Sequence, residues 1–417
     1  MTDSVDHRGR PRVVVTGVGM HTPAGAGLAK NWDALLAGRS MARPVQNFDA
    51  SALSVRFACE VRDFDPVPYL GPKESRRVDR GAQLGFAAAA DALADAGDPG
   101  ADPARCAVVG GTGIGGLVTL EQQVRIYMDK GPDRVSPFFV PMMMPNSTAG
   151  LIGIHFGWTG PMLCITTACA AGANAIGEAL RIIRDGTADV VVAGGTEATL
   201  TAPTVAAFAR MGALSKRNDD PESASRPFDA ARDGFVLGEG AAFVVLERAD
   251  RAQARGARIY GELAGYGTNS DAFHITAPSQ GGAGAAACMQ LALDDANLEA
   301  NAIGHINAHG TSTELNDAAE SQAIRKVFGE GSPPVTGTKG MTGHLIGAAG
   351  ALEAIFALKA AAEGVVPPTA NHTVLAEDVA PLDVVHGSAR TIARAAVLSN
   401  SFGFGGHNAT LVLVPAG

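Results

Sequence analysis

The chain has 417 residues, of which 46% are hydrophobic and 5% aromatic, with 52 glycines and a formal net charge of −9. This acidic balance argues against nucleic acid or an anionic membrane as the main partner, and no stretch has the apolar length of an export leader or a membrane span. The five cysteines are too few for a disulfide scaffold and have no metal-binding spacing, so we expect a reducing, cytoplasmic location: residues 59, 106, 164, 169 and 288.

Short apolar runs that end in glycine alternate with helical patterns through the first half of the chain. Strands are expected at 12–19, 106–111, 188–195 and 241–247, and helices at 31–37 and 79–96. Residues 42–72 form a Pro- and Phe-bearing excursion, and residues 121–141 a polar interruption before a further helix. The polar segment 216–240 is expected to be an ordered loop, because a strand follows it at once.

The same alternation restarts at residue 259. Strands are expected at 259–266, 305–308, 334–337, 395–399 and 409–414, and helices at 285–296, 315–327 and 345–362. Glycine-bounded strands that alternate with helices indicate a largely parallel sheet covered on both faces. The repetition of one scheme predicts a duplicated α/β unit rather than a solenoid.

Cys169 lies where an apolar, strand-like run stops and a helix begins. The run reads as a buried strand, and Ile176, Ala179, Leu180 and Ile183 then recur at the spacing of one buried helix face. A cysteine at a helix N-terminus meets free N–H groups and the positive end of the dipole, which favour the thiolate. On these residues alone, a nucleophile and a small buried hydrophobic residue both remain open.

Three polar, glycine-rich clusters follow short strands in the second half, where open α/β sheets bind ligands. They contain His309, His344 and the loop from Asn400 to Asn408. One cysteine and two histidines suit acyl transfer, provided that the imidazoles are neutral donors, and helix N-termini would lower their pKa in that direction. The remaining histidines before residue 400 are interpreted as structural or surface residues: His7, His21, His155, His274, His305, His372 and His386.

The segment Gly111-Thr-Gly113-Ile-Gly-Gly116 matches the dinucleotide-binding pattern G-x-G-x-x-G. That pattern belongs in the first βα unit and needs an acidic residue after the next strand, whereas here it lies in a later unit. The glycines therefore indicate a close approach of backbone or of an apolar substrate chain.

Four motifs in order resemble the β-ketoacyl-acyl-carrier-protein synthases, and most closely the elongating type II enzymes of the synthase I/II group. They are Thr166-Thr-Ala-Cys169-Ala-Ala-Gly, Asn307-Ala-His309-Gly-Thr-Ser-Thr, Lys339-Gly-Met-Thr-Gly-His344-Leu-Ile-Gly and Asn400-Ser-Phe402-Gly-Phe-Gly-Gly. The likeness runs from the first strand to the last. It implies the thiolase-like fold, two duplicated α/β halves in a five-layered α-β-α-β-α arrangement, with halves at 11–255 and 256–417, and it implies a dimer.

The resemblance also implies roles for individual residues. Cys169 would take an acyl chain from phosphopantetheine on acyl carrier protein, and malonyl carrier protein would then lose CO₂ and condense with it. His309 and His344 would donate to the malonyl carbonyl, with no bound cofactor or metal. The N–H groups of Cys169 and Phe402 would form an oxyanion hole, and Phe402 would also gate the pocket. Lys339 and Glu353 would form a charged pair, and Thr311 and Thr313 would bind the pantetheine arm. The implied pocket residues are Ile114, Phe138, Phe139 and Phe404, with Phe138 or Phe139 reaching across the dimer.

Basic residues offer a docking surface for an acidic carrier protein despite the negative total charge. They are clustered in one segment with two further residues downstream: Lys73, Arg76, Arg77 and Arg80, then Lys216 and Arg217. Docking needs a local patch rather than a net charge, and the alternative is a solvated basic face.

Other classes of protein fit the residues less well. A degradative thiolase would need a second cysteine near the C-terminus, a starter-type synthase would have asparagine in place of His344, and a chain-length factor would lack the nucleophile. A papain-like protease would match the spacing of Cys169 and His309 but lacks the local signature and leaves Lys339 unexplained. A purely structural role is the non-enzyme alternative. Fatty acid elongation and the catalytic subunit of a type II polyketide pair, as homodimer or heterodimer, both remain open.

Overall fold

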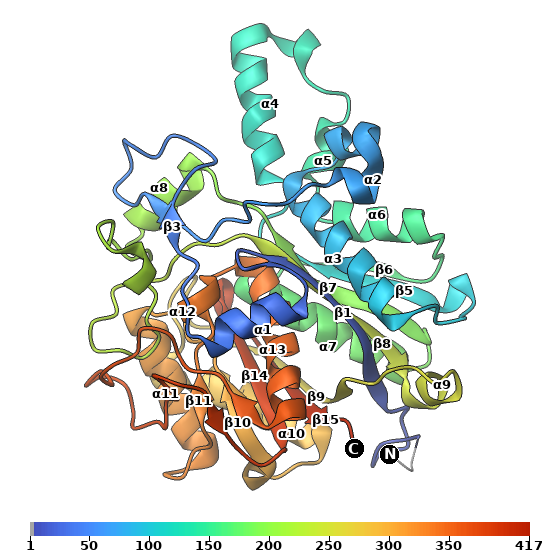
Figure 1. Cartoon of the computed structure of the whole chain (residues 1–417), viewed down its shortest axis with the longest axis vertical. Helices are drawn as coiled ribbons and strands as arrows, with labels where there is room; N and C mark the ends of the chain where they lie inside the picture. Colours follow the sequence, from blue (N-terminus) through green and yellow to red (C-terminus); the bar gives the residue numbers. More distant parts are fainter. Residues whose placement is uncertain (1–3) are drawn as a thin grey trace.

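The computed structural model describes residues 4–417 and contains one large mixed sheet with helices on both faces (Figure 1). The strands run in the order β11-β10-β14-β15-β9-β1-β8-β7-β5-β6. Those of the first half are β1 (Val13–Thr22), β5 (Cys106–Gly111), β6 (Met162–Ile165), β7 (Val190–Glu197) and β8 (Gly240–Arg248). Those of the second half are β9 (Gly261–Ser270), β10 (Ile303–Asn307), β11 (Val335–Thr336), β14 (Ala396–Gly403) and β15 (His407–Pro415).

The two halves of the sheet have the same topology. If the strands named above are numbered first to fifth within each half, both halves have the spatial order third, second, fourth, fifth, first. The halves meet where the two first strands, β1 and β9, pair antiparallel at Val14 with Glu262 and Val15 with Gly261. The predicted duplication of an α/β unit is confirmed.

The prediction of a largely parallel sheet is wrong. Only the outer three strands at each end are parallel, namely β11, β10 and β14 at one end and β7, β5 and β6 at the other. The strands between them run antiparallel to their neighbours. One reason is local: a single short turn, Phe404–Gly406, joins β14 to β15, and so short a connection forces an antiparallel pair.

Helices complete the five layers that the resemblance implies. Helix α3 (Arg80–Ala96) covers the outer face of the first half, and α10 (Ala283–Ala296) and α11 (Glu314–Phe328) cover that of the second. Helices α7 (Ala171–Arg184) and α13 (Ala349–Glu363) pack against each other between the halves (Figure 1). Their small residues contribute much of the largest hydrophobic core cluster, so the two halves share one core.

The remaining elements are short and connect these layers. The helices are α1 (Leu28–Leu36), α2 (Val67–Glu74), α5 (Phe139–Met143), α6 (Ser147–Phe156), α8 (Ala202–Arg210), α9 (Ala249–Ala254) and α12 (Lys339–Thr342). The strands are β2 (Gly25–Ala26), β3 (Arg43–Pro44), β4 (Phe57–Ala58), β12 (Val365–Val366) and β13 (Arg390–Thr391). Within residues 4–417, none of the helices has both the length and the apolar character needed to cross a bilayer.

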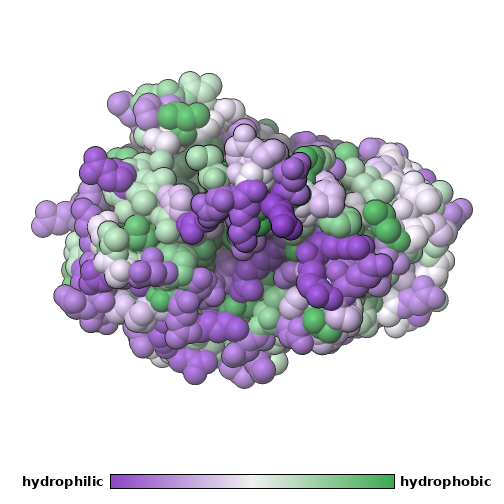
Figure 2. Space-filling view, turned by 90° about the horizontal axis from the view of Figure 1, so that it is seen from above, coloured by the Kyte–Doolittle hydropathy of each residue, from purple (hydrophilic) through white to green (hydrophobic). Residues whose placement is uncertain are grey.

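The polar interruption predicted at 121–141 is largely helical, which corrects the sequence interpretation. Helix α4 (Leu117–Lys130) occupies its first part and ends before Gly131, which has a φ of 82°. In Figure 1 this helix projects from the body of the molecule, and Thr119 is its one buried residue. A helix that buries so little shows no clear apolar stripe in its sequence. Seen from above, the surface mixes hydrophobic and hydrophilic side chains (Figure 2), and α4 contributes exposed Val124, Tyr127 and Met128.

Strand β6, which leads to Cys169, is also different from the prediction. It was expected to be buried, but it is the edge strand of the sheet, and Met162 and Leu163 are 44% and 43% exposed. By contrast, the segment 216–240 is an ordered loop as predicted. Its backbone pairs with neighbouring segments at Phe235 and Leu237.

Candidate active site

Cys169 lies between the edge strand and the central helix. The 3-10 turn Ala168–Ala170 leads directly into α7, and Ala168 has a φ of 49°, a backbone conformation that residues other than glycine rarely adopt. The thiol is buried, with 6% of the residue exposed. The predicted strand, turn and helix around Cys169 are therefore present, and Gly186, with a φ of 79°, follows the end of the helix.

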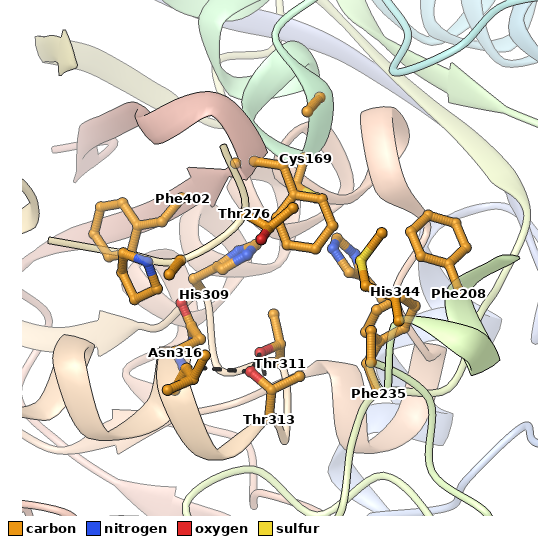
Figure 3. A pocket seen from close by; sticks show the side chains of 18 of the residues that line it. Cys169, Phe208, Phe235, Thr276, His309, Thr311, Thr313, Asn316, His344 and Phe402 are labelled. Atoms are coloured by element: carbon orange, nitrogen blue, oxygen red, sulfur yellow. Dashed lines mark hydrogen bonds between the residues drawn. The ribbon is translucent and has the colours of Figure 1, made fainter. Parts of the chain in front are cut away.

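Two histidines from the second half approach the thiol. His309 follows β10, and His344 follows α12. The cysteine sulfur and one ring nitrogen from each histidine lie within 4.8 Å of one another, and the two rings meet nearly edge to face with centroids 5.4 Å apart. All three residues line one cavity of about 510 Å³ (Figure 3).

The hydrogen bonds to the two imidazoles determine which ring nitrogen carries the proton. The ammonium of Lys339 lies 3.3 Å from Nδ1 of His309 and donates to the His309 carbonyl oxygen at 2.6 Å. The backbone N–H of Ile346 donates to Nδ1 of His344 at 3.3 Å. Each Nδ1 thus faces a donor and must accept, so the proton of each neutral ring is on Nε2.

Both histidines are neutral, as the sequence interpretation required, but for another reason. Burial lowers the pKa of His309 and of His344 well below the ordinary value, and the nearby charge of Lys339 lowers both further. The sequence interpretation instead attributes this lowering of the pKa to helix N-termini. Burial is the larger cause because each residue is only 2% exposed.

The cluster of one cysteine and two histidines resembles a set of metal ligands, yet its tautomers disfavour a cation. A metal binds the lone pair of a ring nitrogen, and here both Nε2 atoms carry protons while both Nδ1 atoms face N–H donors. The charge of Lys339 adds repulsion. The arrangement instead presents hydrogen-bond donors to an oxygen atom of a substrate.

Lys339 and Glu353 form a buried ion pair behind the histidines. Nζ of Lys339 donates to Oε1 of Glu353 at 2.6 Å, and each residue is only 1% exposed. The Ser225 hydroxyl donates to the Lys339 carbonyl at 2.7 Å, which ties the ordered loop 216–240 to this pair. Burial raises the pKa of Glu353 and Lys339 opposes the rise. The pair holds the ammonium against His309.

The free Cys169 thiol differs from the expected thiolate. Burial raises its pKa to about 11, although Lys339 and the backbone N–H groups of Phe404 and Cys169 lower it. Of these two N–H groups, that of Cys169 comes from the turn before α7, whereas that of Phe404 comes from the turn after β14 and not from a helix N-terminus. In this environment desolvation outweighs them, so the resting nucleophile is the thiol and its proton must leave during the reaction.

The N–H group that faces the sulfur belongs to Phe404, not to Phe402 as the sequence resemblance suggested. Phe402 lies within β14 and is paired with Asn408 of β15. Phe404 lies in the turn after the strand, where the backbone is not committed to the sheet. Phe402 is nevertheless part of the cavity, and its ring centroid is 6.0 Å from that of His309.

The cavity contains several further residues predicted from the sequence. Thr311 and Thr313 line it with their hydroxyl oxygens 2.8 Å apart (Figure 3). Ile114 and Phe404 line it as well. Sequence reasoning missed the residues Phe208, Met211, Phe235, Thr276 and Ile346. Phe235 packs edge to face on His344 at 5.2 Å, and its place after a predicted loop gave no local sign of this contact. The histidines interpreted as structural do not line this cavity: His7, His21, His155, His274, His305, His372 and His386.

Phe138 and Phe139 do not line the cavity of their own chain, and the expectation that one of them reaches across a dimer stays a prediction. They belong to the α4–α5 excursion, and Phe138 is 37% exposed beneath the guanidinium of Arg77. That excursion projects from the sheet (Figure 1), so neither ring reaches the Cys169 pocket of its own chain.

The basic residues predicted to dock a carrier protein have different environments. Lys73, Arg76 and Lys216 are exposed, whereas Arg77 and Arg217 are partly buried and have acidic neighbours. Arg80 is bound to both oxygens of Glu239, at 2.7 and 2.9 Å, and to the Val61 carbonyl. The assignment of Arg80 to the docking group is therefore wrong, because its guanidinium N–H groups already bind Glu239 and Val61 within the protein.

The glycines that resemble a dinucleotide motif serve backbone packing, as predicted. A Cβ atom on Gly113 would lie 2.6 Å from Ile346 Cγ2, and one on Gly111 would lie 2.5 Å from the Ala171 carbonyl. Only glycine fits where these segments cross.

Comparisons with known proteins agree with this geometry. A solved structure of the ishigamide ketosynthase/chain length factor superposes with a TM-score of 0.92 and 37% identity, covering 98% of this chain and 100% of that one. A type II polyketide synthase acyl-carrier protein in complex with its ketosynthase bound to the hexaketide gives a TM-score of 0.88 and 30% identity, over 98% of this chain and 100% of that one. The fold and site are therefore those of a thiolase-like ketosynthase.

Sequence comparison is more specific. The family model for the beta-ketoacyl synthase N-terminal domain matches residues 10–252, and that for the C-terminal domain matches residues 260–373. The 3-oxoacyl-[acyl-carrier-protein] synthase 2 of Synechocystis sp. is 48% identical over 411 residues, 96% of this chain and 97% of that protein. The chain belongs to the beta-ketoacyl synthase family of condensing acyltransferases.

Proposed function

We propose that this chain elongates fatty acyl groups by decarboxylative condensation on acyl carrier protein. One observation carries the proposal: Cys169 shares a cavity with two neutral imidazoles that each carry a proton on Nε2. A nucleophile beside two fixed donors suits a reaction that needs an acyl-enzyme and an enolate in the same place.

In the first step Cys169 attacks the thioester carbonyl of an acyl group carried on phosphopantetheine. The new C–S bond forms, the old one breaks, and the proton of the Cys169 thiol ends on the departing pantetheine sulfur. The N–H groups of Cys169 and Phe404 face the sulfur and are proposed to stabilise the oxyanion of the tetrahedral intermediate.

In the second step malonyl-acyl carrier protein replaces the first carrier. His309 and His344 donate from Nε2 to its thioester carbonyl, so the electrons released with CO₂ are held as an enolate. The enolate carbon attacks the acyl group on Cys169, the bond from that acyl carbon to the cysteine sulfur breaks, and the released thiolate takes up a proton from water. Neutral imidazoles suit this role because they donate without losing a proton. The carriers bring both substrates, and no step uses a bound cofactor.

The cavity supports a place for each part of the substrate. Thr311 and Thr313 are proposed to hydrogen-bond the pantetheine arm, and Ile114 and Ile346 to contact the acyl chain. The loop Gly403 to Gly406 is proposed to move with Phe402 and Phe404 as the substrates exchange, since glycine permits the required dihedral angles.

The acidic carrier protein is proposed to dock on the exposed residues Lys73, Arg76 and Lys216 together with the partly buried Arg77 and Arg217. A similar ketosynthase has been solved together with its acyl-carrier protein. Five free thiols, among them Cys169, suit the reducing cytoplasm, which we propose as the location.

We also propose that two chains associate through the edge strand β6 and the neighbouring excursion. The exposed apolar side chains Val140, Met144, Met162 and Leu163 lie there, and an open edge strand is a natural site for pairing. Phe138 or Phe139 would then reach the pocket of the partner chain. Within each chain, residues 11–255 are proposed to form the half that carries the nucleophile and residues 256–417 the half that carries both histidines.

A second candidate is the catalytic subunit of a type II polyketide pair. The high structural similarity to the ishigamide ketosynthase/chain length factor supports it. The two functions differ in partner: the elongating synthase is proposed to act as a homodimer, whereas a polyketide subunit needs a related chain that lacks the cysteine.

The test incubates the purified protein with acyl-acyl carrier protein and then with malonyl-acyl carrier protein. We expect the acyl mass on the peptide containing Cys169, followed by a β-ketoacyl product two carbons longer. No acyl group on Cys169 in folded protein would contradict the proposed function. Activity only in the presence of a cysteine-free homologous chain would favour the polyketide assignment.

A further inference from the structure

Glu197 is a buried carboxylate next to the site that no step above uses. It is the last residue of β7, is 1% exposed and does not line the cavity. Its Oε2 accepts from the N–H of Gly113 at 2.6 Å and from the N–H of Gly347 at 3.1 Å. Its Oε1 accepts from the Thr112 hydroxyl at 3.1 Å. One side chain therefore joins two segments that lie more than 200 residues apart in the sequence.

These two segments cross with their backbones in contact. A Cβ atom on Gly347 would lie 2.3 Å from the Gly113 nitrogen, and a Cβ atom on Gly113 would lie 2.8 Å from Glu197 Oε2. The crossing leaves two buried N–H groups pointing at the same place, and each needs an acceptor. Glu197 supplies that acceptor for both.

Each segment continues directly into the active site. Gly113 precedes Ile114, and Gly347 follows Ile346, and both isoleucines line the cavity that contains Cys169. Ile346 has a φ of 45°, a conformation that a β-branched residue adopts only when its surroundings hold it there. The N–H of this same residue donates to Nδ1 of His344. The anchor at Gly347 therefore lies one residue from the group that sets the tautomer of His344.

We propose that Glu197 is a positioning residue that holds the Ile346 N–H against His344 and holds Ile114 beside Cys169, through its paired hydrogen bonds to Gly347 and Gly113. The inference rests on the proposed function, because it assigns Glu197 to the donor geometry of that reaction. Glu197 touches neither substrate nor reacting atoms and acts through the two glycine segments.

The charge of Glu197 gives a second, independent readout. The carboxylate raises the pKa of the Cys169 thiol, against the opposite effect of Lys339. His309 and His344, the other titratable groups at the thiol, are neutral in this site. Glu197→Gln removes the charge but keeps one oxygen for the two glycine N–H groups, and its amide can donate to the Thr112 hydroxyl. Glu197→Leu removes both the charge and the acceptors.

A matched control is available on the neighbouring strand. Glu247 of β8 is equally buried, at 0% exposed, but it binds Thr16 and Arg255 and does not line the cavity. The full-length variants Glu197→Leu, Glu197→Gln and Glu247→Gln are compared with the wild type. The measurements are CO₂ release from malonyl-acyl carrier protein, the pH dependence of Cys169 alkylation by iodoacetamide, and thermal unfolding.

We expect Glu197→Leu to slow CO₂ release about tenfold or more, since a misplaced donor loses stabilisation of the enolate. Glu197→Gln should stay within about threefold of the wild type, because the acceptor is preserved. Alkylation should shift to lower pH in both Glu197 variants and stay unchanged in Glu247→Gln.

The proposal is overturned if Glu197→Leu releases CO₂ at the wild-type rate. It is also overturned if Glu197→Gln releases CO₂ no faster than Glu197→Leu, or if Glu247→Gln slows CO₂ release as much as Glu197→Leu does. Should Glu197→Leu fail to fold, Glu197→Asp replaces it, because the shorter side chain keeps the charge but cannot reach both glycine N–H groups. A loss of CO₂ release in Glu197→Asp supports the proposal, and a wild-type rate overturns it. A wild-type protein that neither takes an acyl group nor releases CO₂ contradicts the proposed function instead, and the alkylation comparison still tests Glu197.

Discussion

Lys339 presents its ammonium to Nδ1 of His309 at 3.3 Å while Glu353 holds the same ammonium at 2.6 Å. This relationship places the His309 proton on Nε2, the nitrogen available to a substrate. It also means that a charged residue influences the chemistry without entering the cavity, since neither Lys339 nor Glu353 lines it.

The Lys339–Glu353 ion pair is expected to affect both the stability of the fold and the chemistry of His309, and two variants separate these effects. Lys339→Met leaves the Glu353 carboxylate buried without a partner and should cost about 3–5 kcal/mol of unfolding free energy. The double variant Lys339→Met/Glu353→Leu should regain most of that stability, yet CO₂ release from malonyl-acyl carrier protein should stay low because His309 has lost its Nδ1 donor. Denaturant unfolding and the decarboxylation assay check both parts. Recovery of activity together with stability would show that the pair is only structural.

Cys169→Ala should abolish acyl transfer from acyl-acyl carrier protein, because no other thiol in the cavity can form the acyl-enzyme. Cys164→Ala is the matched control, since Cys164 is five residues earlier and does not line the cavity. Mass spectrometry of the intact protein should show an acyl adduct on the wild type and the control alone. An adduct that persists in Cys169→Ala would place the nucleophile elsewhere.

His305 predicts a pH dependence of stability that is independent of the active site. Burial lowers its pKa to about 3, and neither ring nitrogen has a hydrogen-bond partner. Below pH about 6.5 His305 is protonated in the unfolded chain but stays neutral in the folded chain. The contribution of His305 to the free energy of unfolding therefore falls as the pH falls. Relative to His305→Phe, the wild type should lose about 1.4 kcal/mol of unfolding free energy per pH unit below that point.

This comparison is best made as a difference between the two proteins at each pH. Burial raises the pKa of Glu197 and of Glu320 to about 7, and these groups change wild-type stability in the opposite direction over the same range. They are present in both proteins and cancel in the difference. A difference in unfolding free energy that stays constant from pH 7 to pH 5 would mean that His305 is protonated in the folded state.

Carrier docking predicts a charge effect that depends on the donor. Arg76→Glu/Arg77→Glu should weaken acylation by acyl-acyl carrier protein, mainly through the association rate and most strongly at low salt, while acylation by a small acyl thioester stays intact. Lys30→Glu/Arg39→Glu makes the same change of charge on exposed residues of another segment. Equal loss with both donors, or equal loss in both double variants, would remove the docking proposal.

The sequence by itself determined the elements whose patterns are strong and local. The strand at 106–111 has the predicted bounds, and the duplicated order of strands and helices, Cys169 at a turn before a helix, and the two histidines after separate elements are all present in the structure. These features could be predicted because apolar periodicity, glycine at chain reversals and motif spacing are properties of neighbouring residues.

The tertiary structure alone decided which groups meet. It placed the N–H of Phe404, and not that of Phe402, at the sulfur, because Phe402 lies within strand β14 and Phe404 lies in the turn that follows it. In the fold Arg80 forms an ion pair with Glu239, and the strand before Cys169 is an exposed edge strand. Burial also raises the pKa of the Cys169 thiol, whereas a helix N-terminus alone would lower it. Burial, sheet position and contacts between distant segments depend on the whole fold, so a single sequence carries no local sign of them.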